Sequence, residues 1–150
     1  TAAGGTVKKS VNGAHIGIAQ DIEINSNGES HPLYKSKKKK FNSPAFNFDE
    51  VVKIPDKGIC LASNKINKVQ GLYFEVNKTK IWGLQYHPEI TYEKMINLIE
   101  FRKERLIESR KVFKDDTEVQ KHIAFIKKEI SVSDKEKRML ELKNWLNELN

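Results

Sequence analysis

The sequence has 150 residues, enough for one modest domain, and its formal net charge of +7 comes from 27 basic and 20 acidic side chains. Hydrophobic residues make up 38% and the mean hydropathy is −0.61, which is typical of a soluble protein; no apolar run is long enough to cross a bilayer, so we expect no membrane partner. The dense lysine cluster at positions 35 and 37–40 has no interleaved aromatic residues, so we predict a solvated loop and no nucleic-acid partner.

The first part of the sequence is dominated by patterns typical of β-strands. Isoleucines at positions 16, 18, 22 and 24 alternate in part with polar residues, and residues 26–28 supply a turn before a polar, lysine-rich connection. We predict strands at residues 6–9, 15–25, 45–52, 59–63, 69–76 and 81–86, the last two forming a hairpin across residues 77–80.

From Thr91 the hydrophobic period becomes that of a helix, and Thr91 with Lys94 gives a weak N-terminal cap. One face of this helix carries Met95, Leu98, Ile99 and Arg102.

Residues 109–150 predict two further amphipathic helices. The first stripe consists of Val119, Ile123, Ile126 and Ile130, and the second of Met139, Leu142, Trp145, Leu146 and Leu149. A capping box is expected at residues 133–136. Both stripes must be buried: by packing on the preceding domain, in a homodimer, or against a synthase subunit.

Residues 82–89 are the most informative segment, because a short apolar run ends there in a histidine and a glutamate separated by one proline. Pro88 removes a backbone donor and fixes one φ angle, so the strand should stop and hold His87 and Glu89 at its carboxyl end. A histidine oriented by a carboxylate is suited to act as a general base.

The segment from Gly83 to Glu89 resembles the catalytic His/Glu signature of the triad, class I glutamine amidotransferases, in which glycine, a hydrophobic residue, glutamine and an aromatic residue precede His-Pro-Glu. The resemblance runs from about residue 3 to residue 107. Its other landmarks are the Gly-Gly turn at residues 3–7, the Asp-x-Val segment at 48–55, and the strands at 61–64 and 69–71.

This resemblance implies an α/β fold with a flavodoxin-like, doubly wound sheet, and hydrolysis of the glutamine side-chain amide through a cysteine thioester. His87 would be the base, Glu89 would orient it, and the released ammonia would pass to an acceptor. The family's nucleophile turn would lie upstream of Thr1, so we expect residues 1–108 to be the C-terminal part of the amidotransferase domain, inactive alone, and residues 109–150 to be a helical extension.

Phe46, Asn47 and Phe48 occupy the segment that contributes substrate contacts in the family, where a Ser-His or Asn-His pair is common. The histidine is absent here, so the substrate could be glutamine or another γ-glutamyl compound. Alternatively, only the backbone matters there and both phenylalanines simply pack.

Cys60 lies in an apolar strand pattern without the turn that exposes a nucleophile, so we interpret it as a buried hydrophobic residue. His15, His31 and His122 lack a surrounding constellation and are expected to be structural or solvated. No metal-ligand spacing or phosphate-binding loop is present, so no metal and no cofactor are implied. A single cysteine favours a reducing, cytoplasmic compartment.

Two functional classes remain open. One is an enzyme of the amidotransferase type, or a γ-glutamyl peptide or amide hydrolase with the same triad. The other is a catalytically silent module that binds a partner through its C-terminal helices.

Overall fold

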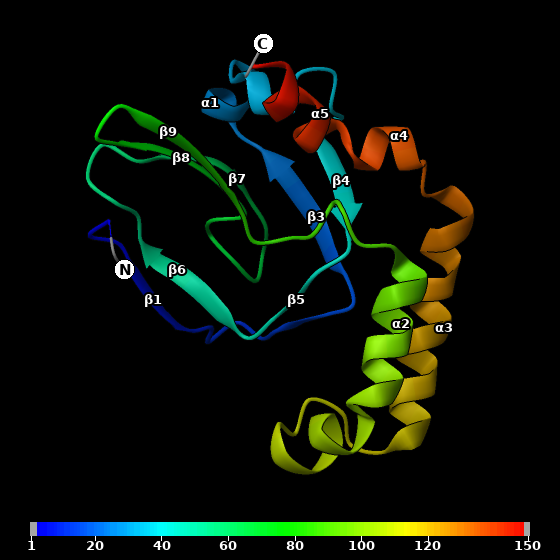
Figure 1. The fold of residues 1–150 in the computed structure, drawn as a ribbon. Helices are drawn as coiled ribbons and strands as arrows, with labels where there is room; N and C mark the ends of the chain where they lie inside the picture. The colour runs from blue at the N-terminus through cyan, green and yellow to red at the C-terminus, as the bar shows by residue number, and fades with distance from the viewer. Residues whose placement is uncertain (1–2, 149–150) are drawn as a thin grey trace.

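The computed structural model describes residues 3–148, and its centre is a five-stranded sheet in which every neighbouring pair is antiparallel (Figure 1). The strand order is β4 (Lys40–Ser43), β3 (Ala19–Ile24), β7 (Ile59–Ser63), β8 (Gly71–Val76) and β9 (Thr79–Leu84). Two small antiparallel ladders accompany it, β1 (Thr6–Lys9) with β6 (Asp49–Lys53) and β2 (His15–Ile16) with β5 (Phe46–Asn47).

The long strand predicted over residues 15–25 is interrupted in the structure. Gly17 has a φ of +82°, and a Cβ atom there would lie 2.7 Å from Ile126 Cδ1 and 2.8 Å from Ile99 Cδ1. Two helices therefore press directly on this backbone, and only a glycine accommodates both the left-handed conformation and the close approach. The alternation of isoleucines did not reveal this break.

The β8–β9 hairpin is confirmed, with a tighter turn than predicted. Val76 pairs with Thr79, so Asn77 and Lys78 alone form the turn, with φ values of 48° and 68°. Positive φ at both positions is the geometry that matches the twist of a two-residue hairpin.

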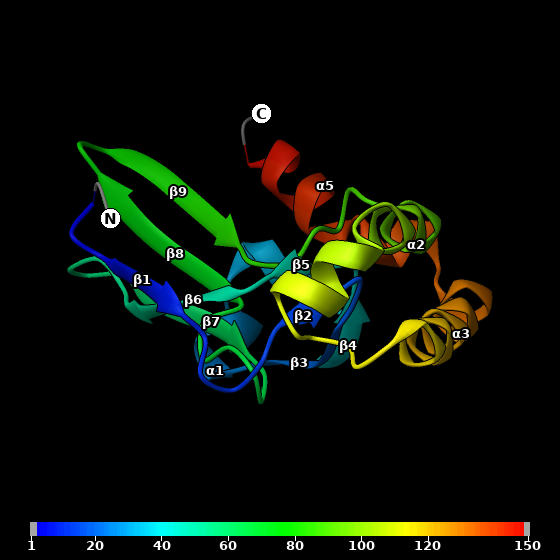
Figure 2. The same ribbon diagram turned by 90° about the horizontal axis from the view of Figure 1, so that it is seen from below.

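The helices are gathered mainly in the second part of the chain. They are α1 (Ser26–Glu29), a 3₁₀ turn (Pro32–Tyr34), α2 (Tyr92–Phe101), a π-helical turn (Arg105–Ser109), α3 (Asp116–Val132), α4 (Lys135–Arg138) and α5 (Leu140–Asn147). Figures 1 and 2 show α2 and α3 side by side at one end of the molecule, and α5 packs against the 3₁₀ turn. Among residues 3–148, no helix combines the length and the apolar character needed to cross a membrane.

Caps at the helix starts confirm one prediction and correct another. Thr91 Oγ1 accepts from the Lys94 backbone N–H at 3.3 Å, as expected. The cap of α4 is Asp134, whose Oδ1 accepts from the Glu136 and Lys137 backbone N–H groups at 2.8 and 3.3 Å. The predicted capping box starting at Ser133 is therefore wrong by one residue.

Two apolar cores hold the fold together. One joins β2, α2 and α3 and contains the predicted first stripe of the extension: Val119, Ile123 and Ile126 are at most 2% exposed. The other lies on the main sheet around Ile22, Leu61 and Tyr86. Since α2 and α3 share one core, this part of the extension packs intramolecularly.

The second predicted stripe is not the buried face of α5. Trp145 and Leu146 are 42% and 52% exposed, whereas Glu141 and Asn144 are buried. Asn144 Nδ2 donates to the carbonyl oxygens of Leu33 and Lys35 at 2.9 and 3.0 Å, so α5 docks on the 3₁₀ turn through a polar face. Leu149 lies outside the described residues.

The lysine-rich connection is also less solvated than predicted. Lys39 and Lys40 make exposed pairs with Glu29 and Asp21. The Lys37 side chain is only 6% exposed and pairs with the fully buried Glu141 at 2.8 Å. The prediction of a solvated loop is therefore wrong for Lys37, because helix α5 covers it.

Candidate active site

The predicted catalytic pair lies in the loop that follows β9. Regular strand structure ends at Leu84, but the Gln85 backbone N–H still donates to the Gln70 carbonyl oxygen at 3.0 Å. The His87 N–H then donates to the Pro44 carbonyl oxygen at 2.7 Å, and the Ile90 N–H to the His87 carbonyl oxygen at 3.1 Å. Backbone hydrogen bonds thus fix the loop on both sides of the histidine.

The side chains of His87 and Glu89 contact each other, with Nδ1 of the imidazole 2.9 Å from Glu89 Oε1. An ionised carboxylate only accepts hydrogen bonds, so Nδ1 carries the proton of the neutral ring and Nε2 is left as an acceptor. The two side chains are 42% and 49% exposed. This arrangement can take a proton at Nε2 while Glu89 stabilises the resulting charge.

The predicted substrate segment runs beside this loop. Asn47 Nδ2 donates to the Gln85 backbone oxygen at 3.2 Å and to its Oε1 at 3.1 Å. Asn67 Nδ2 donates to the same Oε1 at 2.6 Å. The structure therefore brings Asn47 to the loop that carries His87, with its amide group hydrogen-bonded to protein atoms.

The two phenylalanines of that segment pack with the helices. Phe46 and Phe48 lie edge to face with ring centroids 6.1 Å apart. The guanidinium carbon of Arg102 lies 5.2 Å from the Phe46 ring centroid, and that of Arg110 lies 4.6 Å from the Phe48 ring centroid. These side chains, with Leu106, line a cavity of about 140 Å³. Their role in binding substrate stays a prediction.

A separate group of hydrogen-bonded polar side chains surrounds His15, which is 1% exposed. Its Nε2 lies 2.8 Å from Gln70 Nε2, so it must be the unprotonated acceptor of a neutral ring. Burial lowers the pKa of His15 to about 4, and a hydrogen bond to the Ile18 backbone opposes part of that shift. The Gln70 backbone carbonyl oxygen accepts from the Gln85 backbone N–H, which links this group to the loop that carries His87.

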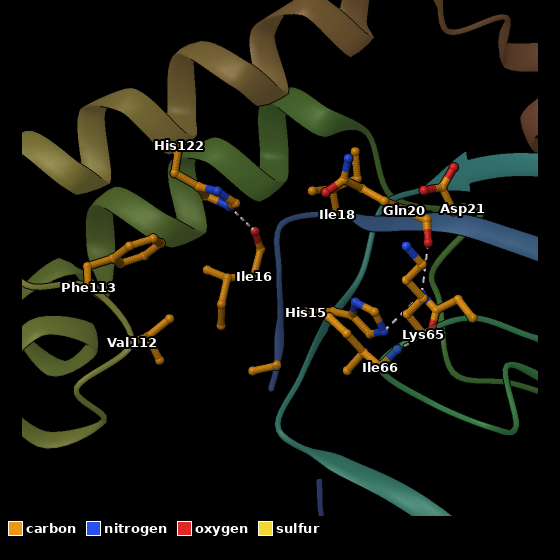
Figure 3. Close-up of a pocket in the computed structure, with 12 residues that line it drawn as sticks. His15, Ile16, Ile18, Gln20, Asp21, Lys65, Ile66, Val112, Phe113 and His122 are labelled. Atoms are coloured by element: carbon orange, nitrogen blue, oxygen red, sulfur yellow. Dashed lines mark hydrogen bonds between the residues drawn. The ribbon is translucent and has the colours of Figure 1, made fainter. Parts of the chain in front are cut away.

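His15 also lines a cavity of about 300 Å³ between the sheet and the helical layer. Figure 3 shows His122 reaching into this region from its helix, with Nε2 2.6 Å from the Ile16 carbonyl oxygen. Phe113 and Ile18 contribute apolar walls. His15 and His122 are thus structural, as expected, and so is His31, whose Nδ1 accepts from the Leu33 N–H.

Cys60 does not have the environment of a nucleophile. Its thiol is partly buried, with Sγ 3.4 Å from the Lys68 carbonyl oxygen and 3.5 Å from that of Ala62. Burial raises the pKa of the Cys60 thiol, which disfavours the reactive thiolate. Within residues 3–148, no group of three or more His, Cys, Asp or Glu side chains could hold a metal ion.

Sequence reasoning missed three side chains, those of Arg138, Glu141 and Lys37, that contact the loop carrying His87 or the groups that hold this loop. The Tyr86 hydroxyl donates to Glu141 Oε1 at 2.7 Å, Arg138 Nη1 donates to the Ile90 carbonyl oxygen at 3.0 Å, and Lys37 pairs with Glu141. The sequence carries no local signal for them, because a lysine in a polar loop and charged residues in an amphipathic helix are both expected to face water.

No protein-family model matches the chain. Over 74 residues it is 32% identical to a γ-glutamyl-L-1-hydroxyisopropylamide hydrolase from a Pseudomonas species, an alignment that covers 49% of this chain and 25% of that protein. The part of the chain that matches thus spans about a quarter of the length of this curated relative.

Solved structures share the fold. A glutamine amidotransferase from Thermotoga maritima superposes with a TM-score of 0.62 at 18% identity, over 97% of this chain and 55% of that one. The protein SMU.1228c superposes with a TM-score of 0.67 at 18% identity, over 99% and 57%. The expected α/β fold class is confirmed: over little more than half the length of those proteins, this chain has a glutamine-amidotransferase-like fold.

Proposed function

We propose that the full-length protein hydrolyses the amide bond of a γ-glutamyl compound, with glutamine as the first candidate substrate. The observation that carries this proposal is the hydrogen bond from His87 Nδ1 to Glu89 Oε1, which leaves Nε2 free to accept a proton at the end of a sheet of the amidotransferase type. The similarity to a γ-glutamyl amide hydrolase supports the same bond as the point of attack.

In this mechanism the nucleophile is a cysteine that we expect upstream of Thr1. Nε2 of His87 removes the thiol proton, and the thiolate attacks the γ-carbonyl carbon. When the tetrahedral intermediate collapses, the C–N bond breaks and His87 returns the proton to the leaving nitrogen, giving ammonia or an amine and a thioester. Water, activated by the same imidazole, then hydrolyses the thioester to glutamate. Glu89 holds the ring and stabilises its charged form.

A second candidate is a substituted γ-glutamyl amide, for which the leaving group is an amine larger than ammonia. The observation in its favour is the relative, which is named as a hydrolase of such an amide. The segment Phe46-Asn47-Phe48 lacks the histidine that the family commonly has there, and a changed pocket in this segment agrees with a different leaving group.

The test is to measure ammonia or amine release by the full-length protein from glutamine and from a γ-glutamyl alkylamide. His87→Ala should lower kcat by about 10³-fold with the fold intact, since general acid–base catalysis typically contributes on the order of 10² to 10⁴-fold. Glu89→Gln should lower kcat less, because the amide still accepts a hydrogen bond from Nδ1.

His122→Ala is the matched control for loss of an imidazole. His122 lies on α3, and its imidazole contacts the Ile16 backbone carbonyl instead of a carboxylate, so its replacement should leave kcat unchanged. An unchanged rate in His87→Ala would refute the assignment of the base. If the wild-type protein releases neither ammonia nor amine and another residue replaces the upstream cysteine, the chain is instead a binding module with a relic site.

Three further points remain predictions. They are the delivery of ammonia to an acceptor, the association with a synthase subunit or with a second copy of the chain, and a cytoplasmic location. The exposed side chains of Trp145 and Leu146 on α5 are the surface to test first for a partner.

A further inference from the structure

The two residues that flank the His87–Pro88–Glu89 triplet are both held by the corner between α4 and α5. Before the triplet, the Tyr86 hydroxyl donates to Glu141 Oε1 at 2.7 Å. After it, the Ile90 carbonyl oxygen accepts from Arg138 Nη1 at 3.0 Å. The C-terminal segment thus reaches the loop at both ends, from 55 and 48 residues further along the chain.

Lys37 contacts both residues that make these hydrogen bonds, Arg138 and Glu141. Its Nζ donates to Glu141 Oε2 at 2.8 Å and to the carbonyl oxygens of Lys137 and Arg138 at 2.9 and 3.3 Å. The Lys37 and Glu141 side chains are 6% and 0% exposed. A buried pair whose polar atoms all have partners tolerates little displacement, because moving either group leaves a charge away from water without a partner.

Tyr86 is equally constrained. It is 2% exposed, and its hydroxyl also lies 3.1 Å from the Tyr34 hydroxyl. Burial raises the pKa of Tyr86 well above its ordinary value, so the phenol stays a proton donor toward Glu141. By contrast His87 and Glu89 are exposed, and their own hydrogen bond contributes little rigidity.

We propose that Arg138 and Glu141 are positioning residues, which hold Tyr86 and Ile90 so that His87 and Glu89 keep the geometry needed for proton transfer. The proposal rests on the proposed function for its catalytic consequence. Neither residue touches the reacting atoms. Their effect is orientation, and a catalytic group displaced by about 1 Å can lose up to about 10²-fold in rate.

Two variants break the two contacts separately in the full-length protein. Arg138→Met keeps the aliphatic stem and removes the guanidinium group. Tyr86→Phe keeps the ring and removes the hydroxyl that donates to Glu141. Arg138→Lys restores a charged donor and should rescue in part. Lys137→Met is the matched control, because the Lys137 side chain is 68% exposed and its pair with Asp134 spans 3.5 Å.

The first measurement is hydrogen exchange at the amides of His87 and Ile90, whose bonds to Pro44 and His87 report the loop. Arg138→Met and Tyr86→Phe should each raise the exchange rate at one or both amides by about tenfold, which is local opening without global unfolding. Amides of β8 should exchange as in the wild type. Lys137→Met should change neither site.

The second measurement is the tautomer of the neutral His87 ring, read by nitrogen NMR of the histidine-labelled protein. The wild type should carry its proton on Nδ1, which donates to Glu89. Loss of the positioning contacts should shift protons to Nε2, a change that a general loss of stability in a folded protein does not produce. With an active enzyme, kcat should fall about tenfold while KM stays constant.

Wild-type exchange rates and a wild-type tautomer in both folded variants would overturn the proposal. If Arg138→Met fails to fold, Tyr86→Phe decides the question, because it removes one oxygen atom and leaves the Lys37–Glu141 pair in place. Altered exchange and tautomer in a protein that hydrolyses no γ-glutamyl compound would support the positioning role and refute the proposed function.

Discussion

Two pairs in which a glutamate contacts a basic side chain have almost the same length but differ in their exposure to solvent. The His87–Glu89 pair is 2.9 Å long and nearly half exposed, whereas the Lys37–Glu141 pair is 2.8 Å long and buried. Distance alone therefore does not say what a pair contributes. The exposed pair is accessible for chemistry and contributes little to stability, and the buried pair contributes to the position of its neighbours and is costly to break.

The largest expected effect follows from removing one member of the buried pair. Lys37→Met should lower the free energy of unfolding by about 3 kcal/mol, because it leaves the Glu141 carboxylate buried without its cation. Urea denaturation measures this. The double variant Lys37→Met/Glu141→Gln should recover much of the loss, since the amide carries no charge and still accepts from Tyr86.

Lys39→Met is the surface counterpart for this experiment. Lys39 pairs with Glu29 at 2.9 Å, but both side chains are about half exposed, so no measurable loss is expected. Equal losses in Lys37→Met and Lys39→Met would show that burial does not distinguish the pairs.

The next effect concerns His15, whose pKa in the folded protein is about 4 against 6.5 for a free imidazole. Between these values the unfolded state binds more protons, so stability falls as the pH falls through the window from 6.5 to 4. Lowering the pH from 7 to 5 should cost the wild type about 2 kcal/mol from this group alone.

His15→Gln should flatten this part of the pH dependence, since an amide can replace the acceptor for Gln70 without titrating. The measurement compares urea denaturation at pH 5 and pH 7 in both proteins. His31→Asn is the control, because burial lowers the pKa of the less buried His31 as well and should contribute a smaller slope. A slope unchanged by His15→Gln would mean that His15 is charged in the folded protein.

The smallest effect on stability is expected at the exposed pair. Glu89→Gln should change the free energy of unfolding by no more than about 0.5 kcal/mol, because solvent and salt screen a pair with nearly half of each side chain exposed. The same denaturation experiment, repeated with added salt, checks this. A loss comparable to that of Lys37→Met would show that the loop depends on its own pair for its structure.

The sequence determined the local elements well where the pattern and the packing agree. The β8–β9 hairpin, the Thr91 cap and the buried stripe of α3 follow from alternation, turn chemistry and helical spacing. His87 and Glu89 could be placed together because a single proline separates them and the strand before them is short. Interactions within a few residues are encoded locally, and a linear reading recovers them.

Tertiary packing decided the rest. The break at Gly17 depends on Ile99 and Ile126, and the buried face of α5 depends on Lys37, which lies 104 residues from Glu141. A charged residue in an amphipathic helix is expected to face water, and only a partner brought from a distant segment makes its burial favourable. Pairing across such distances is a property of the folded chain, which is why hydrophobic periodicity in α5 selected the wrong face.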